Sequence, residues 1–245
     1  MKKLRTVFFF FILWLSLLLS LLLLPIYYLL VGIYPASAHR FIFLSTHTWG
    51  KLVLSAAGIR LSVKGKENFP EQGGFCIVAN HQSYFDIPVL LSVFPYVLHF
   101  VAKREMVKIP FISSWMKLMG CSFINRTNKR QCIGVYHQEI DKIRKGEKLI
   151  LFPEGTRGHS AEIGRFKPSS LRLFLSAGIP ILPVTIQGAY HCYEAEKLIQ
   201  KGIVYVVIHA VMPSHAVVDN IRVIIEVGQK EKAFICNEDL SGIKF

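Results

Sequence analysis

A long run without a single charged residue, Val7–Tyr34, lies near the start of the chain and limits what that part can fold into. A bilayer core about 30 Å thick is crossed by a helix of about 20 apolar residues, so the run is long enough to span it even if tilted or bent at Pro25. The apolar region of a signal peptide is usually about 7–15 residues long. Although Ala36-Ser37-Ala38 resembles a cleavage site, the length predicts a retained membrane anchor, which we assign to residues 1–40.

The sequence leaves the orientation of this anchor open. Lys2, Lys3 and Arg5 precede it and favour a cytoplasmic N-terminus. A single crossing would then place the rest of the chain outside, unless the anchor bends back as a hairpin near Pro25, lies in the interface, or is followed by a second crossing over Phe41–Ile59. Because this last stretch carries several polar residues, we expect residues 41–60 to be an interfacial segment. The domain that follows is expected to face the cytoplasm at the cell membrane.

The charge balance of the whole chain is strongly basic, with 29 Lys and Arg against 16 Asp and Glu and a formal net charge of +13. Such a balance suits anionic partners, among them phosphate groups, acidic carrier proteins, nucleic acid and an anionic membrane surface, and does not choose between them. The five cysteines are scattered, odd in number and without the spacing of a zinc site. They indicate reduced thiols in a cytosol-facing domain, and no metal site is expected.

Beyond the first 60 residues, apolar runs of strand length alternate with stretches of helical periodicity. This alternation predicts a single α/β domain over residues 61–230, with a mostly parallel or mixed central sheet, followed by a C-terminal tail, 231–245. The expected strands are Phe75–Ala79, Leu98–Ala102, Ser122–Asn125, Leu149–Phe152, Ile181–Ile186, Val204–His209 and Val223–Val227. The expected helices are Ile87–Val93, Pro110–Met119, Lys129–Arg144 and Pro168–Ala177.

The first polar constellation, Asn80-His81-Gln82-Ser83-Tyr84-Phe85-Asp86, follows the expected strand Phe75–Ala79. His81 and Asp86 could meet only across a turn, since on one helix they would point about 140° apart. A carboxylate on one imidazole nitrogen would orient the ring, and the other nitrogen could then remove a proton from a hydroxyl. In isolation the pattern is a weak signal, and it is more typical of a loop histidine followed by an aspartate that caps a helix.

Three further constellations also lie at or near strand ends, where open α/β sheets bind ligands. Phe152-Pro153-Glu154-Gly155-Thr156-Arg157 forms a tight turn that could hold a hydroxyl through Glu154 and a phosphate through Arg157, or could be a surface turn with a local ion pair. Gly120–Arg126 delivers Arg126 to a strand end, where it could bind a phosphate or be an ordinary solvated residue. Ile179-Pro180-Ile181-Leu182-Pro183-Val184 has no reactive group and could be a pocket wall or core.

In this order and spacing, N-H-Q-S-Y-F-D at 80–86, G-C-S-F-I-N-R at 120–126, F-P-E-G-T-R at 152–157 and I-P-I-L-P-V at 179–184 resemble the glycerolipid acyltransferases of the 1-acylglycerol-3-phosphate O-acyltransferase type. The resemblance implies that His81 deprotonates a glycerol hydroxyl and that Asp86 orients His81. It also implies that a group of residues binds the acceptor, namely Arg126, Glu154, Gly155, Thr156 and Arg157. Lys103 and Lys167 are expected as additional phosphate contacts.

The expected reaction moves an acyl group from an acyl-CoA or acyl-carrier-protein thioester to 1-acylglycerol 3-phosphate, giving phosphatidic acid. No cofactor is expected, because the donor is itself a substrate; the expected partners are a lysophospholipid acceptor, the donor and membrane lipid, and not nucleic acid. The motifs leave open the same chemistry on glycerol 3-phosphate, another lysophospholipid or an ornithine-type lyso-lipid. A different class, a non-catalytic basic protein that binds anionic lipid, would have no need of His81 or Asp86.

Overall fold

The computed structural model describes residues 2–158, 160–212 and 218–239, and seven strands of this part form one mixed sheet. The strand order is β1-β7-β6-β2-β5-β3-β4, and every neighbouring pair is parallel except β6 with β7. The prediction of an α/β fold with a mostly parallel or mixed sheet is therefore confirmed. The strands are β1 Ile59–Lys64, β2 Phe75–Ala79, β3 Leu98–Lys103, β4 Ser122–Ile124, β5 Lys148–Leu151, β6 Ile181–Gln187 and β7 Gly202–Ile208.

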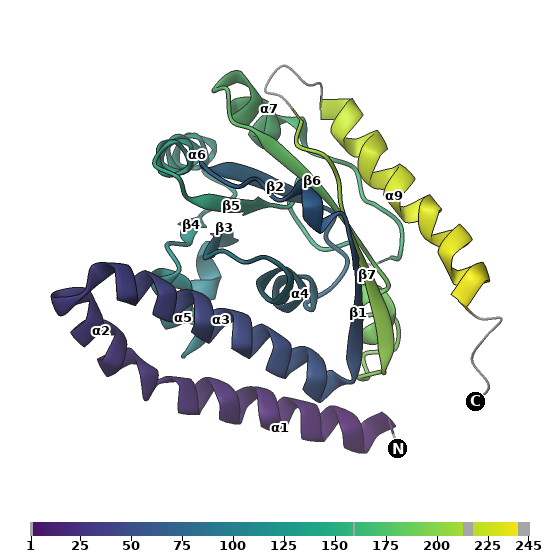
Figure 1. Cartoon of the computed structure of the whole chain (residues 1–245), viewed down its shortest axis with the longest axis horizontal. Coiled ribbons are helices and arrows are strands. Elements are labelled where there is room, and N and C mark those ends of the chain that lie inside the picture. Colours follow the sequence, from purple (N-terminus) through teal and green to yellow (C-terminus); the bar gives the residue numbers. More distant parts are fainter. Residues whose placement is uncertain (1, 159, 213–217, 240–245) are drawn as a thin grey trace.

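Helices cover both faces of the sheet (Figure 1). On one face lies α4, which packs against the long helix α3, and on the other lie α6, α7 and α9. The helices are α1 Lys2–Ser20, α2 Leu23–Ile33, α3 Pro35–Ala57, α4 Asp86–Val93, α5 Ile112–Leu118, α6 Lys129–Arg144, α7 Pro168–Ser176, α8 Ala189–Cys192 and α9 Val218–Asp239, with short 3-10 turns at Lys66–Asn68 and Arg104–Lys108.

The central strand β2 shows why these runs form strands. Its five side chains are all buried, Ile77 and Ala79 in the cluster shared with α4, Cys76 and Val78 in the cluster shared with α6 and α7. A strand that is covered on both faces needs apolar residues at every position, so its sequence is a continuous run. The bounds predicted for this strand agree with the structure, and its carboxyl end carries the first polar constellation into the interior of the molecule.

The N-terminal run of apolar residues folds as two helices followed by a reversal of the chain. The helix breaks between α1 and α2 because Pro25 has no N–H to donate to the carbonyl of Leu21, and its ring clashes there. The chain then turns back at Tyr34, and α3 runs beside α1 (Figure 1). Taken together, Lys2–Ile33 is the one helical run of the described residues that is long and apolar enough to cross a membrane.

The helix α1 also packs against the α/β domain. Phe9 is buried against the ring of Phe85, with ring centroids 5.5 Å apart, and Lys2 pairs with Glu196 at 2.9 Å. The hydroxyl of Thr6 accepts the backbone N–H of Ile199. Helix α1 therefore lies along the domain, while many of its other apolar side chains point away from it and are exposed.

One predicted strand is wrong, and one strand of the sheet was not predicted. Val223–Val227 is not a strand but the middle of α9. Its β-branched residues suggested a strand, yet Val218, Ile221 and Ile225 are buried at helical spacing, with α9 packed against β6. The strand β1 was missed because its apolar residues alternate with Arg60, Ser62 and Lys64, as on an edge strand, rather than forming a continuous run.

Candidate active site

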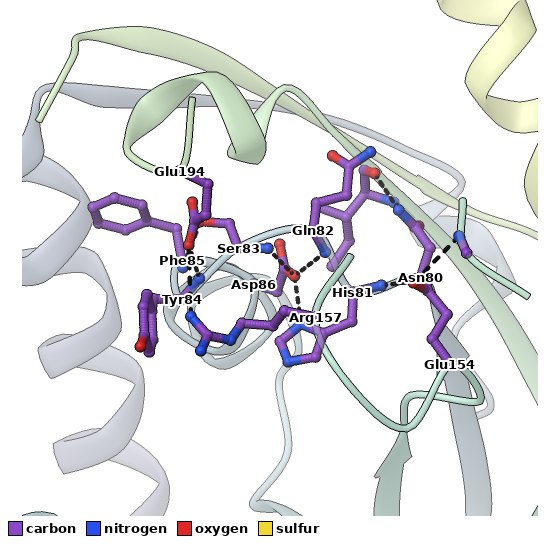
Figure 2. Close-up of polar contacts among 12 residues, drawn as sticks. Asn80, His81, Gln82, Ser83, Tyr84, Phe85, Asp86, Glu154, Arg157 and Glu194 are labelled. Atoms are coloured by element: carbon purple, nitrogen blue, oxygen red, sulfur yellow. Dashed lines mark hydrogen bonds and ion pairs between the residues drawn. The ribbon is translucent and has the colours of Figure 1, made fainter. Parts of the chain in front are cut away.

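The turn after β2 brings His81 and Asp86 into direct contact (Figure 2). Nδ1 of His81 lies 2.7 Å from Oδ2 of Asp86, and the same oxygen accepts the backbone N–H groups of Gln82 and Ser83 at 2.7 and 2.8 Å. Asp86 is fully buried at the first position of α4, and it does not cap that helix through its side chain. The alternative in which Asp86 serves only as a helix cap is therefore excluded, and the carboxylate orients the imidazole.

This contact also decides which imidazole nitrogen is available. A carboxylate has only acceptor atoms, so Nδ1 of His81 must carry the proton in the hydrogen bond to Asp86. Nε2 of the neutral ring then keeps its lone pair. With 18% of its side chain exposed, His81 is partly open to a bound molecule, whereas Asp86 is closed off from solvent. The pair has the arrangement of a general base and the group that orients it.

The turn itself is fastened to the neighbouring strand β6. The side-chain amide of Asn80 donates to the carbonyl of Ile186 and accepts its N–H, both at 2.8 Å. These two hydrogen bonds to β6 hold Asn80, the residue just before His81, in place. The fourth constellation, Ile179–Val184, enters the same strand and belongs to the core, because Ile181, Leu182 and Val184 are all fully buried.

The second constellation, together with Gly158 just after it, makes three contacts with His81. The Phe152 ring stacks on the imidazole, with centroids 4.0 Å apart and planes 17° from parallel. Oε1 of Glu154 accepts the backbone N–H of His81 at 2.9 Å, and the carbonyl of His81 accepts the N–H of Gly158 at 2.8 Å. The two turns, separated by more than 60 residues in the chain, are in this way joined into one unit.

Both oxygens of Glu154 are directed at the main chain. Oε1 accepts the N–H of His81, and Oε2 accepts the N–H of Gly164 at 3.3 Å. Burial raises the pKa of Glu154 above its usual value, although these two hydrogen bonds act in the opposite direction. The carboxylate is 6% exposed. The expected contact between Glu154 and a glycerol hydroxyl stays a prediction, since its contacts in the structure are to the backbone of His81 and Gly164.

Arg157 lies beside the same turn, on the opposite side of it from Glu154 (Figure 2). Its guanidinium is centred 3.4 Å from the ring centroid of Tyr84, and its side chain is 30% exposed. Nη1 is 3.9 Å from Oε1 of Glu194.

The other expected acceptor contacts of this segment lie in the turn before Arg157 or beside it. Gly155 takes a positive φ of 73°, which lets the chain turn tightly before Arg157. The side chain of Lys167 lies against Gly155, and Thr156 is exposed.

Lys103 and Arg126 also lie at the carboxyl ends of strands, but on strands farther from β2 in the sheet. Lys103 ends β3 and Arg126 follows β4, and both are exposed. Nζ of Lys103 is 3.6 Å from the carboxylate of Glu105. Because β5 separates β3 from β2, these two cations flank the turn that carries His81 and do not belong to the packed group around it.

Three residues of this site were not assigned any function by sequence reasoning. Phe152 and Tyr84 were inside the quoted motifs, but only their stacking on His81 and Arg157 reveals what they do. Glu194 lies outside every motif and had no signal at all. It is 110 residues from Tyr84, whose N–H it accepts at 2.8 Å, so the contact exists only in the folded chain.

Two observations bear on metal and thiol chemistry at or near the site. Among the described residues, His, Cys, Asp and Glu side chains form no group of three or more that could hold a metal ion. The thiol of Cys192, which lies near the same turn, has its pKa raised to about 11 by burial and by Glu194 and Asp86. This cysteine is therefore protonated at neutral pH and poorly suited to act as a nucleophile.

Comparison with known proteins identifies the family. A family model described as Acyltransferase matches residues 60–187, which is more than half of the chain and includes β2, the His81–Asp86 turn and the Glu154–Arg157 turn. This chain belongs to the acyltransferase family. The resemblance inferred from the ordered motifs is thus confirmed at the level of the family.

Individual relatives of this acyltransferase carry a more specific name. A protein of Mycoplasma pneumoniae, named probable 1-acyl-sn-glycerol-3-phosphate acyltransferase, is 36% identical over 156 residues, which cover 62% of this chain and 58% of that protein. The 1-acyl-sn-glycerol-3-phosphate acyltransferase of Pseudomonas aeruginosa is 32% identical over 181 residues, covering 73% and 68%. The chain thus spans less than two thirds of the length of the Mycoplasma pneumoniae protein.

The fold of this acyltransferase is also found in a solved structure. The crystal structure of the 1-acyl-sn-glycerophosphate (LPA) acyltransferase from Thermotoga maritima superposes with a TM-score of 0.85 at 27% sequence identity. The match covers 95% of this chain and 98% of that one, so it includes the N-terminal helices as well as the sheet.

Proposed function

We propose that this protein transfers a fatty acyl group from a thioester donor to the free hydroxyl of 1-acylglycerol 3-phosphate, giving phosphatidic acid. The observation that carries the proposal is the His81–Asp86 pair, with Nδ1 and Oδ2 2.7 Å apart, beside the turn on which the partly exposed guanidinium of Arg157 lies. A general base beside a phosphate-binding group is what an acceptor with both a hydroxyl and a phosphate monoester requires. The names of the relatives support the same acceptor.

In the proposed reaction the acceptor hydroxyl is the nucleophile. Its oxygen attacks the thioester carbonyl carbon while Nε2 of His81 takes its proton, which gives a tetrahedral intermediate and an imidazolium whose Nδ1–H remains bonded to Asp86. The carbon–sulfur bond then breaks, and the imidazolium returns the proton to the leaving thiolate. The products are the new ester and a free thiol, and the base is regenerated without any cofactor.

The size of each contribution sets what can be expected of variants. General-base assistance is typically worth about 10²–10⁴-fold in rate. Correct placement of two bound substrates can supply as much as about 7–11 kcal/mol. Residues that hold the acceptor are therefore as important as the base. We assign the acceptor phosphate to Arg157, supported by Gly155, Thr156 and Lys167, and place Lys103 and Arg126 as outer phosphate contacts at the same sheet edge.

The location of the protein is part of the proposal. Helices α1 and α2 present exposed apolar residues away from the domain, and the N-terminal Lys2, Lys3 and Arg5 suit an anionic surface. We propose that residues 1–40 anchor the chain in the cell membrane, that residues 41–60 lie at the interface, and that the catalytic domain, 61–230, acts on the cytoplasmic side. Because acceptor and product are lipids, this arrangement keeps the site where its substrates are.

The test is an acceptor and donor panel on the purified protein in detergent. Wild type should consume 1-acylglycerol 3-phosphate and release thiol from acyl-CoA or acyl-carrier protein, and comparison of these two donors identifies the one used. His81→Ala should lose this activity, whereas His137→Ala, at an exposed position on α6, should keep it. An active His81→Ala protein would refute the mechanism. Turnover of lysophosphatidylcholine but not of the phosphate monoester would refute the proposed acceptor.

A further inference from the structure

A buried carboxylate outside all four motifs lies behind the proposed phosphate-binding arginine. The Glu194 side chain follows α8 and is 3% exposed. Oε1 accepts the backbone N–H of Tyr84 at 2.8 Å, and within the described residues Oε2 has no hydrogen-bond partner. A carboxylate that is taken out of water is unfavourable unless a cation or several donors compensate it. One backbone N–H does not, so the compensation must come from a nearby positive charge.

That charge is supplied by Arg157. Its Nη1 lies 3.9 Å from Oε1 of Glu194, and the centre of its guanidinium lies over the ring of Tyr84, 3.4 Å from the centroid (Figure 2). Glu194 thus acts on Arg157 in two ways. It attracts the guanidinium directly, and through the backbone of Tyr84 it holds the residue on whose ring the guanidinium stacks.

The arrangement restricts Arg157 without consuming it. A guanidinium has five N–H donors in a fixed plane, and stacking on Tyr84 occupies only one face of that plane. The ion pair engages one edge, which leaves other donors for a phosphate, the ligand that this fork fits best. An arginine side chain that is held in this way loses less conformational freedom when the ligand binds than a freely moving one does.

The negative charge of Glu194 also opposes the arrival of a phosphate, so two effects compete. Repulsion falls with distance, and a phosphate bound to the free edge of the guanidinium would lie on the far side of it from Glu194. The attraction between Glu194 and Arg157 acts over a shorter distance than the repulsion between Glu194 and the phosphate, and it sets the orientation of the guanidinium. Orientation should therefore outweigh repulsion.

We infer that Glu194 is a positioning residue that holds Arg157 ready for the phosphate of the acceptor. The inference rests on the proposed function, because it takes the acceptor to be a phosphate monoester. A merely structural Glu194 would act through the neighbouring turn, and its loss would disturb His81 and Asp86 as much as Arg157. The two roles differ in what they do to binding of a lipid with a phosphate and of the same lipid without one.

The variant that separates them is Glu194→Gln. The amide oxygen can still accept the N–H of Tyr84, while the charge that attracts Arg157 is removed. The matched control is Glu196→Gln, the same change two residues along, where the carboxylate is exposed and pairs with Lys2. Dissociation constants for lysophosphatidate and for the corresponding monoacylglycerol would be measured in detergent without any donor, so that turnover is not needed.

Glu194→Gln should weaken lysophosphatidate binding by about tenfold, because an arginine that is no longer held must lose its side-chain freedom when the phosphate binds. Monoacylglycerol binding should stay unchanged in Glu194→Gln, and both constants should stay unchanged in Glu196→Gln. In an Arg157→Gln background, Glu194→Gln should have no further effect on lysophosphatidate, as expected for two residues that act through one contact.

Unchanged or tighter lysophosphatidate binding in Glu194→Gln would overturn the inference, as would an equal loss for both lipids. An additive loss in the Arg157→Gln background would overturn it too. These outcomes are separate from failure of the proposed function, which would appear as a wild-type protein that releases no thiol with lysophosphatidate.

Discussion

Oδ2 of Asp86 lies 2.7 Å from Nδ1 of His81 and at the same time accepts two backbone N–H groups of the turn between them. One oxygen atom therefore holds both the imidazole and the loop that carries it. The backbone bonds hold the carboxylate in place, and the carboxylate in turn fixes the tautomer of the imidazole. We therefore expect the charge of Asp86, and not only its shape, to be important for the proposed reaction.

Replacement of Asp86 by Asn should test that point. The amide can offer one oxygen to the three donors, but it has no charge to stabilise the imidazolium that forms when His81 takes a proton. We expect kcat to fall by about 10²-fold or more, with little change in the KM for the acceptor. Asp141→Asn, at an exposed position on α6, is the matched control and should be silent. Steady-state kinetics distinguish the two, and a full-activity Asp86→Asn protein would contradict the assigned role.

Glu154→Gln should distinguish two roles of Glu154, holding the backbone of His81 in place and contacting the acceptor. Each oxygen of Glu154 accepts a backbone N–H, so an amide must turn its NH₂ group toward one of the two donors. The lost acceptor should lower the free energy of unfolding by about 1–3 kcal/mol. Because His81 is displaced, kcat should fall while the acceptor KM is largely kept. Denaturant unfolding and steady-state kinetics would check both; a rise in KM alone would instead favour a direct contact with the acceptor.

Gly164→Ala tests the position of the Glu154 carboxylate through its other hydrogen bond, the one to the N–H of Gly164. A Cβ atom at this position would lie 2.6 Å from Oε2 of Glu154, closer than two such atoms can approach. The carboxylate must therefore move, and we expect lower kcat together with lower stability. Gly134→Ala is the control, since a Cβ there meets nothing within 4 Å and lies inside α6. That change should stabilise the protein by about 0.5–1 kcal/mol and leave kcat unaltered, as thermal unfolding and activity assays would show.

Glu139 should contribute to the pH dependence of stability. It is fully buried on α6, where Oε2 lies 2.6 Å from Nε2 of His99 and Oε1 lies 2.8 Å from Nζ of Lys142. Burial by itself would raise the pKa of Glu139, but the contacts with His99, Lys142 and Ser122 outweigh it and lower the pKa below its usual value of 4.5. Glu147 faces the other nitrogen of His99 at 3.6 Å.

A lowered pKa in the folded state means that the ionised carboxylate stabilises the fold. This contribution is present above pH 4.5 and is lost as the pH falls through the lower value of the folded state. Glu139→Gln should therefore be less stable than wild type at neutral pH, and the difference should shrink under acid conditions. Urea unfolding as a function of pH measures it, and a difference that is constant from pH 7 down to the acid range would contradict the prediction.

Much of the fold could be predicted from local sequence. The bounds of α6 were predicted as observed from apolar residues at helical spacing. The structure adds that Asn128 caps its first turn by accepting the N–H of Gln131. The strand β2 was equally clear from its continuous apolar run. By contrast, Val223–Val227 has the composition of a strand and the position of a helix face, and only packing against β6 decides in favour of α9.

The sequence by itself determined that an apolar segment precedes an α/β domain, and that His81, Asp86, Glu154 and Arg157 lie near the ends of strands. These properties depend on hydrophobic periodicity and on turn residues, which act over a few positions. Only the tertiary structure decided that Glu154 binds the backbone of His81, that Phe152 stacks on its ring, and that Glu194 lies behind Arg157. Such contacts join residues far apart in the chain, and no local pattern encodes a partner that is brought near only by folding.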